Sequence, residues 1–330
     1  MYCSITRSGG DSILAMRLSE AGEGLCPALG CPPTRTPIER SFLVSFSAAR
    51  RSGLPMCLPL CLLPLKFRAA GSATSSLGNE GFHPLAHQSC WKPSFPSEEV
   101  ALPVALNFNG NRYKGKHIAN PVKRAAEKLT KELRSIGVRV GGHPKVGGKP
   151  PSASDNLIAK LNSPTLRVML RYMNSKSANY FAEVFGKLLA VSRSGTPGSI
   201  AKGARAIEAF AARHGVNLTA YDSSGLSYSN RVSPKGLTKL LRFSEQQKWG
   251  KVLRNTLPSG GEGTLEDRLH GVPIRVKTGT LDSISALSGW IRLKRTGTRA
   301  EFSIMSRGMP KYRAARIEDR IVKLLRKRAR

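Results

Sequence analysis

Two short segments, one hundred residues apart, carry a hydroxyl, a carboxamide and an ammonium group. The first is Ser177-Ala-Asn179, and the second is Lys277-Thr-Gly-Thr280. A lysine attracts an anion electrostatically, and it lowers the pKa of a neighbouring lysine. The hydroxyl of Thr278 or Thr280 can donate a hydrogen bond to the same anion. Gly279 leaves room for another extended chain to approach the strand.

Each of these residues also has a purely structural interpretation. Ser177 alone could cap a helix, since apolar and aromatic residues follow it. Lys277 could be an ordinary charge on a strand edge. The stretch Asp222–Ser227 is interpreted as a tight turn, because Gly225 and the clustered hydroxyls suit one. The combination of segments, and no single member, therefore points to a site.

Capping residues and hydrophobic periodicity predict the helices that would position these segments. Pro121 opens a helix that ends before Gly137, and Ser199 caps another. The predicted helices span residues 122–135, 156–161, 164–174, 177–190, 200–214, 234–243 and 315–328. The last of these places four apolar residues on one face, at Ile317, Ile321, Leu324 and Leu325.

Strands are predicted at residues 100–109, 138–140, 274–278, 286–293 and 300–306, with a loop at 141–155. Arg295–Gly297 forms a hairpin turn between the last two strands. Helices followed by an antiparallel meander and a closing helix predict an α+β fold.

The charge of the chain is its most unusual bulk property. Its 330 residues carry a net charge of +32, with apolar residues at 40%. Such a charge favours polyanions, namely nucleic acid, anionic lipid or an acidic cell-wall polymer, unless the surface is simply basic throughout. No basic repeat is interleaved with aromatic residues, which make up 6% of the chain. We therefore expect no specific nucleic-acid partner, and keep a basic nucleic-acid-binding protein as the third alternative.

The first ninety residues differ from the rest of the chain in their cysteine content. All six cysteines lie there, and His83, His87 and Cys90 bring three potential metal ligands close in sequence. Since the cysteines lack paired C-x-x-C spacing, we expect no metal site and no cofactor.

Residues 1–98 show no helical or strand period, which predicts a boundary near residue 99. The apolar stretch Leu54–Leu65 follows Arg50-Arg51 as in a secretory signal, but it lies far from Met1 and contains three prolines. It is also too short to span a membrane, so we expect no transmembrane span. The alternatives for residues 1–98 are a disordered segment, a mistranslated one, and a true start near Met56.

Six segments in order carry a family resemblance, which covers about residues 100–310. They are Ile118–Ala126, Ser163–Leu166, Met173–Glu183, Asp222–Pro234, Leu257–Leu265 and Lys277–Leu281. The chain resembles the penicillin-binding proteins of the D-Ala-D-Ala carboxypeptidase/endopeptidase type, the low-molecular-mass class C group. The resemblance implies a penicillin-binding/β-lactamase-like transpeptidase fold, with an antiparallel sheet packed against helices. Residues 99–330 would be the carboxyl-terminal part of that domain.

The resemblance also implies roles for the residues at the site. Ser177 would relay a proton to the leaving nitrogen, and Asn179 would bind the substrate's amide and a neighbouring lysine. With Lys277 they form the catalytic set, while Thr278, Gly279 and Thr280 bind substrate. The backbone N–H of Thr280 would supply one oxyanion-hole donor. Peptidoglycan stem peptides would be the substrates, β-lactams the inhibitors of a complete site, and the cell envelope or periplasm the location.

The S-x-x-K element that supplies the family's nucleophile has no convincing counterpart. Ser89–Lys92 is followed by Pro93 and Pro96, which break the helix that must carry both side chains. Ser199–Lys202 opens a helix but follows Ser177, so we interpret Ser199 as a cap. Two functions stay open: a serine-type carboxypeptidase acting through an acyl-enzyme, truncated and inactive in this chain if the nucleophile is missing, and a protein that binds peptidoglycan peptides without turnover.

Overall fold

The computed structural model describes the strand segments 2–7, 16–17 and 76–77, and residues 91–104, 108–135, 137, 139–146, 163–194 and 197–329. The chain divides into two compact units. The first holds Leu166–Ala178 and Ala204–Arg330 with the two amino-terminal strands, and the second holds Asn179–Gly203 with the segments around residues 91–146. The predicted helix at 156–161, Leu54–Leu65, Ser89, and the candidate ligands His83, His87 and Cys90 lie outside the described residues.

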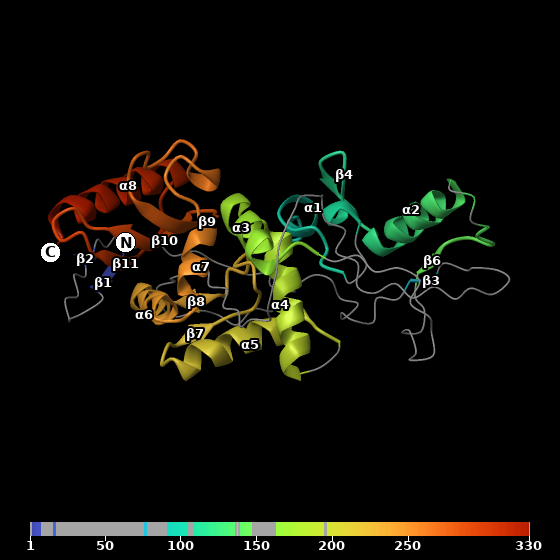
Figure 1. Ribbon diagram of the computed structural model, residues 1–330, viewed down its shortest axis with the longest axis horizontal. Helices are drawn as coiled ribbons and strands as arrows, with labels where there is room; N and C mark the ends of the chain where they lie inside the picture. The colour runs from blue at the N-terminus through green and yellow to red at the C-terminus, as the bar shows by residue number, and fades with distance from the viewer. Residues whose placement is uncertain are drawn as a thin grey trace. The chain divides into compact units, whose positions relative to one another are not determined.

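A five-stranded antiparallel sheet forms the centre of the first unit, in the order β2-β1-β11-β10-β9 (Figure 1). Its strands are β1 Tyr2–Arg7, β2 Met16–Arg17, β9 Ile274–Leu281, β10 Ile284–Arg292 and β11 Arg299–Arg307. Lys277 of β9 pairs with Ser288 of β10, which in turn pairs with Ser303 of β11. The three strands predicted in this region are therefore confirmed, and each is longer than predicted.

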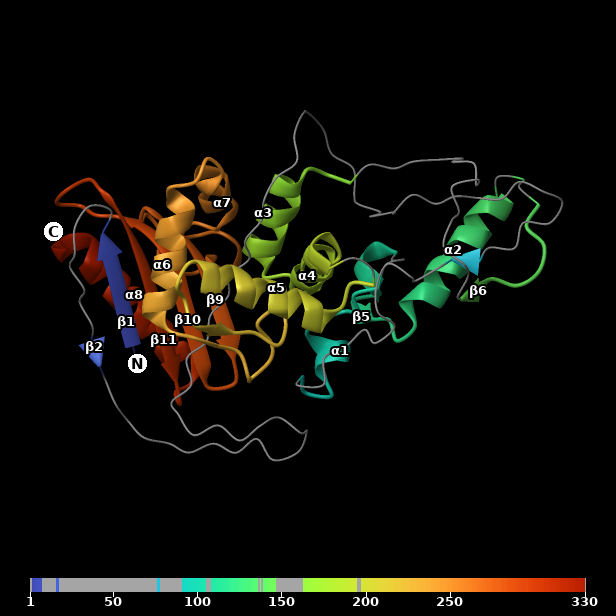
Figure 2. The same ribbon diagram turned by 90° about the horizontal axis from the view of Figure 1, so that it is seen from below.

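Helices cover both faces of this sheet, as Figure 2 shows. The helices and short elements of the unit are α3 Leu166–Lys176, most of α5 Ile200–Arg213, β7 Leu218–Thr219, β8 Arg231–Val232, α6 Pro234–Glu245, α7 Gly250–Thr256, η2 Gly263–Leu265 and α8 Lys311–Arg328. One core joins α8, through Val322 and Leu325, to Leu287 and Phe302 of the sheet. Another joins α6, through Leu240 and its neighbours, to the opposite side of the sheet. Because successive strand residues face opposite sides, both faces of β10 are apolar and buried.

Local signals predicted most helices of this unit. Ser233 caps α6, and its hydroxyl accepts a hydrogen bond from the N–H of Gly236. The hydroxyl of Ser199 accepts from the N–H of Lys202 at 3.1 Å, which confirms Ser199 as the cap of α5. Helix α8 starts four residues earlier than predicted. Of the four apolar residues predicted on one face, Leu325 is buried and Leu324 is 49% exposed, because the 3.6-residue period places Leu324 at the border of the apolar stripe.

The second unit is smaller and more irregular. It contains β3 Ser76–Leu77, α1 Phe95–Glu98, η1 Asn109–Asn111, β4 Arg112–Tyr113, β5 Lys116–His117, α2 Pro121–Ser135, β6 Lys145–Val146 and α4 Asn179–Ser194. Helix α2 is confirmed as predicted, and Gly137 follows it at a φ of +87°. No helix of the described residues is long and apolar enough to cross a membrane.

Two predicted strands of this unit are wrong. At residues 100–104 the backbone bonds locally: the N–H of Val100 donates to Phe95 and that of Val104 donates to Leu102. The side chain of Asn111 also donates to the carbonyl of Leu102. These groups therefore have no strand partner, although Val100 and Val104 are buried as a strand's apolar residues would be. Residues 139–140 are likewise irregular.

A buried lysine ties α4 to that irregular segment. Lys187 is fully buried, and its ammonium donates to the carbonyl of Pro103 at 2.7 Å. Burial lowers the pKa of Lys187 to about 8, while the nearby carboxylate of Glu183 opposes the shift. The Lys187 ammonium therefore links α4 to the irregular segment around Pro103.

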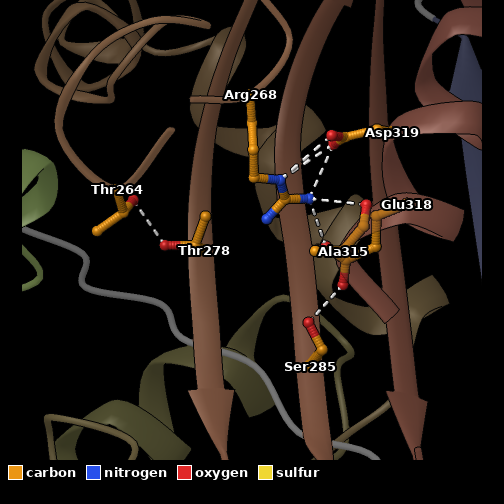
Figure 3. Close-up of polar contacts among 7 residues, drawn as sticks. All are labelled: Thr264, Arg268, Thr278, Ser285, Ala315, Glu318 and Asp319. Carbon is orange, nitrogen blue, oxygen red and sulfur yellow. Dashed lines mark hydrogen bonds and ion pairs between the residues drawn. The ribbon is translucent and has the colours of Figure 1, made fainter. Parts of the chain in front are cut away.

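An ionic network fastens α8 to the rest of the first unit (Figure 3). The guanidinium of Arg268 donates to Glu318 at 2.8 Å, to Asp319 at 2.8 Å and to the carbonyl of Ala315. Ser285 of β10 donates to the second oxygen of Glu318 at 2.7 Å. Glu318 is fully buried, and burial raises its pKa while the bonds from Ser285 and Arg268 lower it. Arg268 thus holds together α8, β10 and the segment that follows η2.

We predict that Arg268→Met lowers the free energy of unfolding by about 3 kcal/mol, because it leaves the Glu318 carboxylate buried without its cation. Since protonation neutralises Glu318, the loss should shrink as the pH falls through the raised pKa of this carboxyl. Urea unfolding at several pH values measures the loss of stability and its dependence on pH. Arg292→Met, at an exposed arginine, is the control and should cost less than about 0.5 kcal/mol. Equal losses in the two variants would contradict the prediction.

Candidate active site

Ser177 and Lys277, one hundred residues apart in sequence, meet in the first unit. The ammonium of Lys277 donates to the hydroxyl oxygen of Ser177 at 2.8 Å and to the carbonyl of Thr278 at 2.7 Å. Lys277 is supplied by the middle of β9, and Ser177 directly follows α3. The structure therefore brings together the hydroxyl of the first segment and the ammonium of the second.

The backbone at Ser177 adopts an unusual conformation. Its φ is +51°, in the left-handed region, and the N–H of Ala178 bonds back to the carbonyl of Met173. Such a conformation costs a residue with a side chain roughly 1 kcal/mol, which surrounding contacts must offset. Ser177 is therefore the residue at which α3 ends and turns, and it does not cap α4. The predicted helix from residue 177 instead begins at Asn179.

Further contacts hold the end of α3 in place. Asn174 is buried and donates to the hydroxyl of Thr256 in α7 at 2.8 Å. Gly263 of η2 has a φ of +56°, and a Cβ there would lie 2.3 Å from the carbonyl oxygen of Ser175. Only glycine lets η2 approach the end of α3 this closely. The next residue, Thr264, then reaches Thr278: the Thr278 hydroxyl donates to the Thr264 hydroxyl oxygen at 2.7 Å (Figure 3).

Burial of the ammonium lowers the pKa of Lys277 to about 8. The charged form is disfavoured because the group loses water, and two hydrogen bonds to neutral oxygens compensate only part of that loss. A lysine with a pKa near 8 exchanges its proton easily close to neutral pH. The arrangement can therefore move a proton to or from the Ser177 hydroxyl and attract an anion.

The remaining predicted site residues lie as follows. Thr278 is buried, Gly279 is buried and Thr280 is exposed, all on β9. Asn179 begins α4 in the second unit, where its side chain donates to the carbonyl of Glu99 at 3.1 Å. The hydrogen bonds predicted from Asn179 to the substrate's amide and to a neighbouring lysine stay predictions.

The stretch Asp222–Ser227 is confirmed as a structural turn. The carboxylate of Asp222 accepts from the N–H groups of Gly225 and Ser227, and from the side chain of Asn230. Of the two S-x-x-K strings, Ser199–Lys202 begins α5, and the ammonium of Lys202 bonds the carbonyl of Pro197. In the other string Lys92 lies outside a helix, and Ser89 lies outside the described residues.

Two residues that position the site were missed as site residues. Gly263 and Thr264 act through contacts made only in the folded chain. Gly263 and Thr264 lie inside Leu257–Leu265, one of the segments that carry the family resemblance. A glycine followed by a hydroxyl in such a segment was the available signal.

We predict that Gly263→Ala destabilises the protein by about 2 to 3 kcal/mol, since it adds a clash with Ser175 to the strain of a positive φ. Gly297→Ala is the matched control, because Gly297 has a φ of +64° but open space around its Cβ position. It should cost only about 1 kcal/mol. Thermal unfolding of both variants compares them, and a control that costs as much as Gly263→Ala would refute the steric argument.

A direct titration tests the electrostatics of Lys277. We expect its side-chain ¹³Cε signal, assigned by its loss in Lys277→Met, to titrate with a pKa of about 8. Because the folded state binds this proton less tightly than the unfolded state, Lys277→Met should also reduce the gain in stability between pH 8 and pH 10. A signal that titrates near the ordinary lysine value of about 10.4 would contradict burial as the controlling effect.

Comparison with known proteins gives a consistent result. Residues 107–328 match the D-Ala-D-Ala carboxypeptidase 3 (S13) family. The chain is 29% identical over 184 residues to the D-alanyl-D-alanine carboxypeptidase DacB of Haemophilus influenzae, covering 53% of this chain and 38% of that one. It is 30% identical over 207 residues to the D-alanyl-D-alanine carboxypeptidase of an Actinomadura species, covering 58% of this chain and 38% of that one.

Solved structures show the same fold. Penicillin binding protein 4 of Haemophilus influenzae superposes with a TM-score of 0.58 at 24% identity, over 64% of this chain and 51% of that one. The predicted penicillin-binding α+β fold is therefore confirmed, and the chain spans well under half the length of both curated relatives. With the family match covering most of its residues, this chain belongs to the D-Ala-D-Ala carboxypeptidase 3 (S13) family.

Proposed function

We propose that this chain binds peptides ending in D-Ala-D-Ala, as part of a serine-type D-Ala-D-Ala carboxypeptidase or endopeptidase that acts on peptidoglycan stem peptides. The observation that carries the proposal is the 2.8 Å contact between Lys277 and Ser177. This contact places the Lys277 ammonium and the Ser177 hydroxyl side by side next to β9, the last strand of the sheet. Cleavage of an amide needs both a cation for the terminal carboxylate and a proton route to the leaving nitrogen.

The outer edge of β9 is suited to an extended peptide. The N–H of Val276 donates to Pro258, away from β10, at 3.1 Å. Because backbone direction alternates along a strand, the N–H groups of Thr278 and Thr280 face the same edge. A substrate strand could pair there, with the Thr280 N–H in the role of oxyanion donor. Gly279, between them, keeps this edge free of a bulky side chain.

Each site residue then has a distinct role in the proposal. Lys277 attracts the carboxylate of the terminal D-alanine, and the exposed hydroxyl of Thr280 donates to it. Ser177 passes a proton towards the leaving nitrogen, helped by the pKa of about 8 at Lys277.

A second function, binding without turnover, is favoured by one observation. Ser199 caps α5 and the ammonium of Lys202 binds the carbonyl of Pro197, which favours a structural role for this S-x-x-K string. Without a serine nucleophile the site could position and polarise a D-Ala-D-Ala peptide but could not attack it.

The proposed location is the cell envelope or periplasm, where peptidoglycan stem peptides occur. The net charge of +32 suits contact with acidic envelope polymers. β-Lactams would act as inhibitors wherever a nucleophile completes the site.

Binding of an acetylated Lys-D-Ala-D-Ala peptide, followed by calorimetry or NMR, tests the proposal. Lys277→Met should weaken binding about tenfold or more, since it removes a charge-assisted interaction with the carboxylate. Lys235→Met, at an exposed lysine of α6, is the control and should leave binding unchanged. Failure of the unaltered chain to bind the peptide would exclude both functions.

A labelling experiment separates the two functions. If the chain forms an acyl-enzyme, benzylpenicillin will add covalently, and intact mass will rise by the mass of the antibiotic. The adduct should disappear in Ser89→Ala or Ser199→Ala, whichever residue reacts. Peptide binding without an adduct would leave binding without turnover as the function.

A further inference from the structure

The exposed face of α8 carries a continuous line of positive charge. Its five members are Arg313, Arg316, Arg320, Lys323 and Lys327, all of them exposed. Their spacing of three and four residues places them on a single face of the helix. From the first to the last, this basic stripe runs about 21 Å along the helix axis, at 1.5 Å per residue.

The acidic residues of α8 do not interrupt the stripe. Glu318 is fully buried on the opposite face, and Asp319 is bound to Arg268 through two oxygens. The buried positions of the helix, including Ala314, Val322 and Leu325, lie on that same inner face. The helix therefore turns its carboxylates inward and its cations outward. Like charges spaced this way repel one another, so an anionic partner would stabilise the face.

Two apolar side chains border the stripe. Tyr312 is 69% exposed and Leu324 is 49% exposed. At about 100° per residue, Tyr312 lies at one border of the stripe and Leu324 at the other. Exposed cations with a tyrosine and a leucine beside them can contact both the charged headgroups and the interfacial region of a membrane.

We propose that this face of α8 binds the surface of an anionic phospholipid membrane. The five cations would lie among the lipid phosphates, and Tyr312 and Leu324 would enter the boundary between headgroups and acyl chains. A nucleic acid would satisfy the cations but offer no apolar environment to Leu324, so the membrane is the better partner. The proposal is independent of acyl-transfer chemistry.

Vesicle co-sedimentation of the full chain tests this proposal. The vesicles are phosphatidylcholine with about a quarter phosphatidylglycerol, and pure phosphatidylcholine vesicles are the neutral reference. We expect binding to the anionic vesicles only, and its loss as salt rises to about 0.5 M. The triple variant Arg316→Glu, Arg320→Glu, Lys323→Glu should bind at least about tenfold more weakly.

A matched control separates the stripe from the overall charge. Lys235→Glu, Lys248→Glu and Lys251→Glu together change the net charge equally, at exposed lysines of the same unit. This control should retain binding within about twofold. If both triple variants lose binding alike, or if the unaltered chain fails to bind anionic vesicles, the proposal is overturned.

Leu324→Ser gives a test that does not depend on charge reversal. It should weaken vesicle binding several-fold and leave binding to duplex DNA unchanged, because only the membrane accommodates the leucine. A chain that binds DNA through the stripe more tightly than vesicles, with Leu324→Ser without effect on either, would assign the face to nucleic acid instead. Binding of the D-Ala-D-Ala peptide should persist in every variant, which keeps this test apart from that of the proposed function.

Discussion

The hydrogen bond between Lys277 and Ser177 is the constraint on which the site depends. It requires the end of a helix and the middle of a strand to meet, although one hundred residues separate them. The surrounding contacts hold the helix end against the strand. Asn174 fixes the helix end against α7, and Gly263 admits η2 beside it. The backbone of Ser177 adopts a strained left-handed conformation, which directs its hydroxyl toward the lysine.

The same arrangement explains why the ammonium is poised to exchange its proton. A lysine on an open strand edge would keep its ordinary pKa, because water would surround it. Here the helix end covers Lys277 and replaces water with a hydroxyl and a carbonyl oxygen. The pKa falls to about 8 as a result. Tertiary packing, and not the lysine itself, thus lowers this pKa.

Features with a local cause were predictable from sequence. The cap at Ser199, the proline-initiated helix at Pro121 and the turn around Asp222 depend on residues a few positions apart, and the structure has all three. Features that depend on distant partners were not predictable. Strand β1 pairs with β11 across almost the whole chain. Leu324 lies on the predicted apolar face of α8 but is 49% exposed.

The same distinction between local and distant causes applies to the residues of the candidate site. Ser177 and Lys277 were found because two short segments resembled those of a family, but their contact could not be derived from spacing. Gly263 and Thr264 were missed as site residues although they lie in a segment that carries the resemblance, because their contacts with Ser175 and Thr278 appear only when η2 packs beside α3. Arg268 was missed because an arginine before a strand carries no distinctive pattern, and its importance arises from the buried acid on α8.

A double-mutant cycle on Ser177 and Lys277 tests the central claim most directly. Ser177→Ala, Lys277→Met and the double variant would each be measured for peptide binding and for the free energy of unfolding. A coupled pair predicts an interaction free energy of about 1.5 kcal/mol between the two positions, as for a hydrogen bond to a charged group. Effects that add to within about 0.5 kcal/mol in both measurements would show that the two residues act independently, and would contradict a shared site.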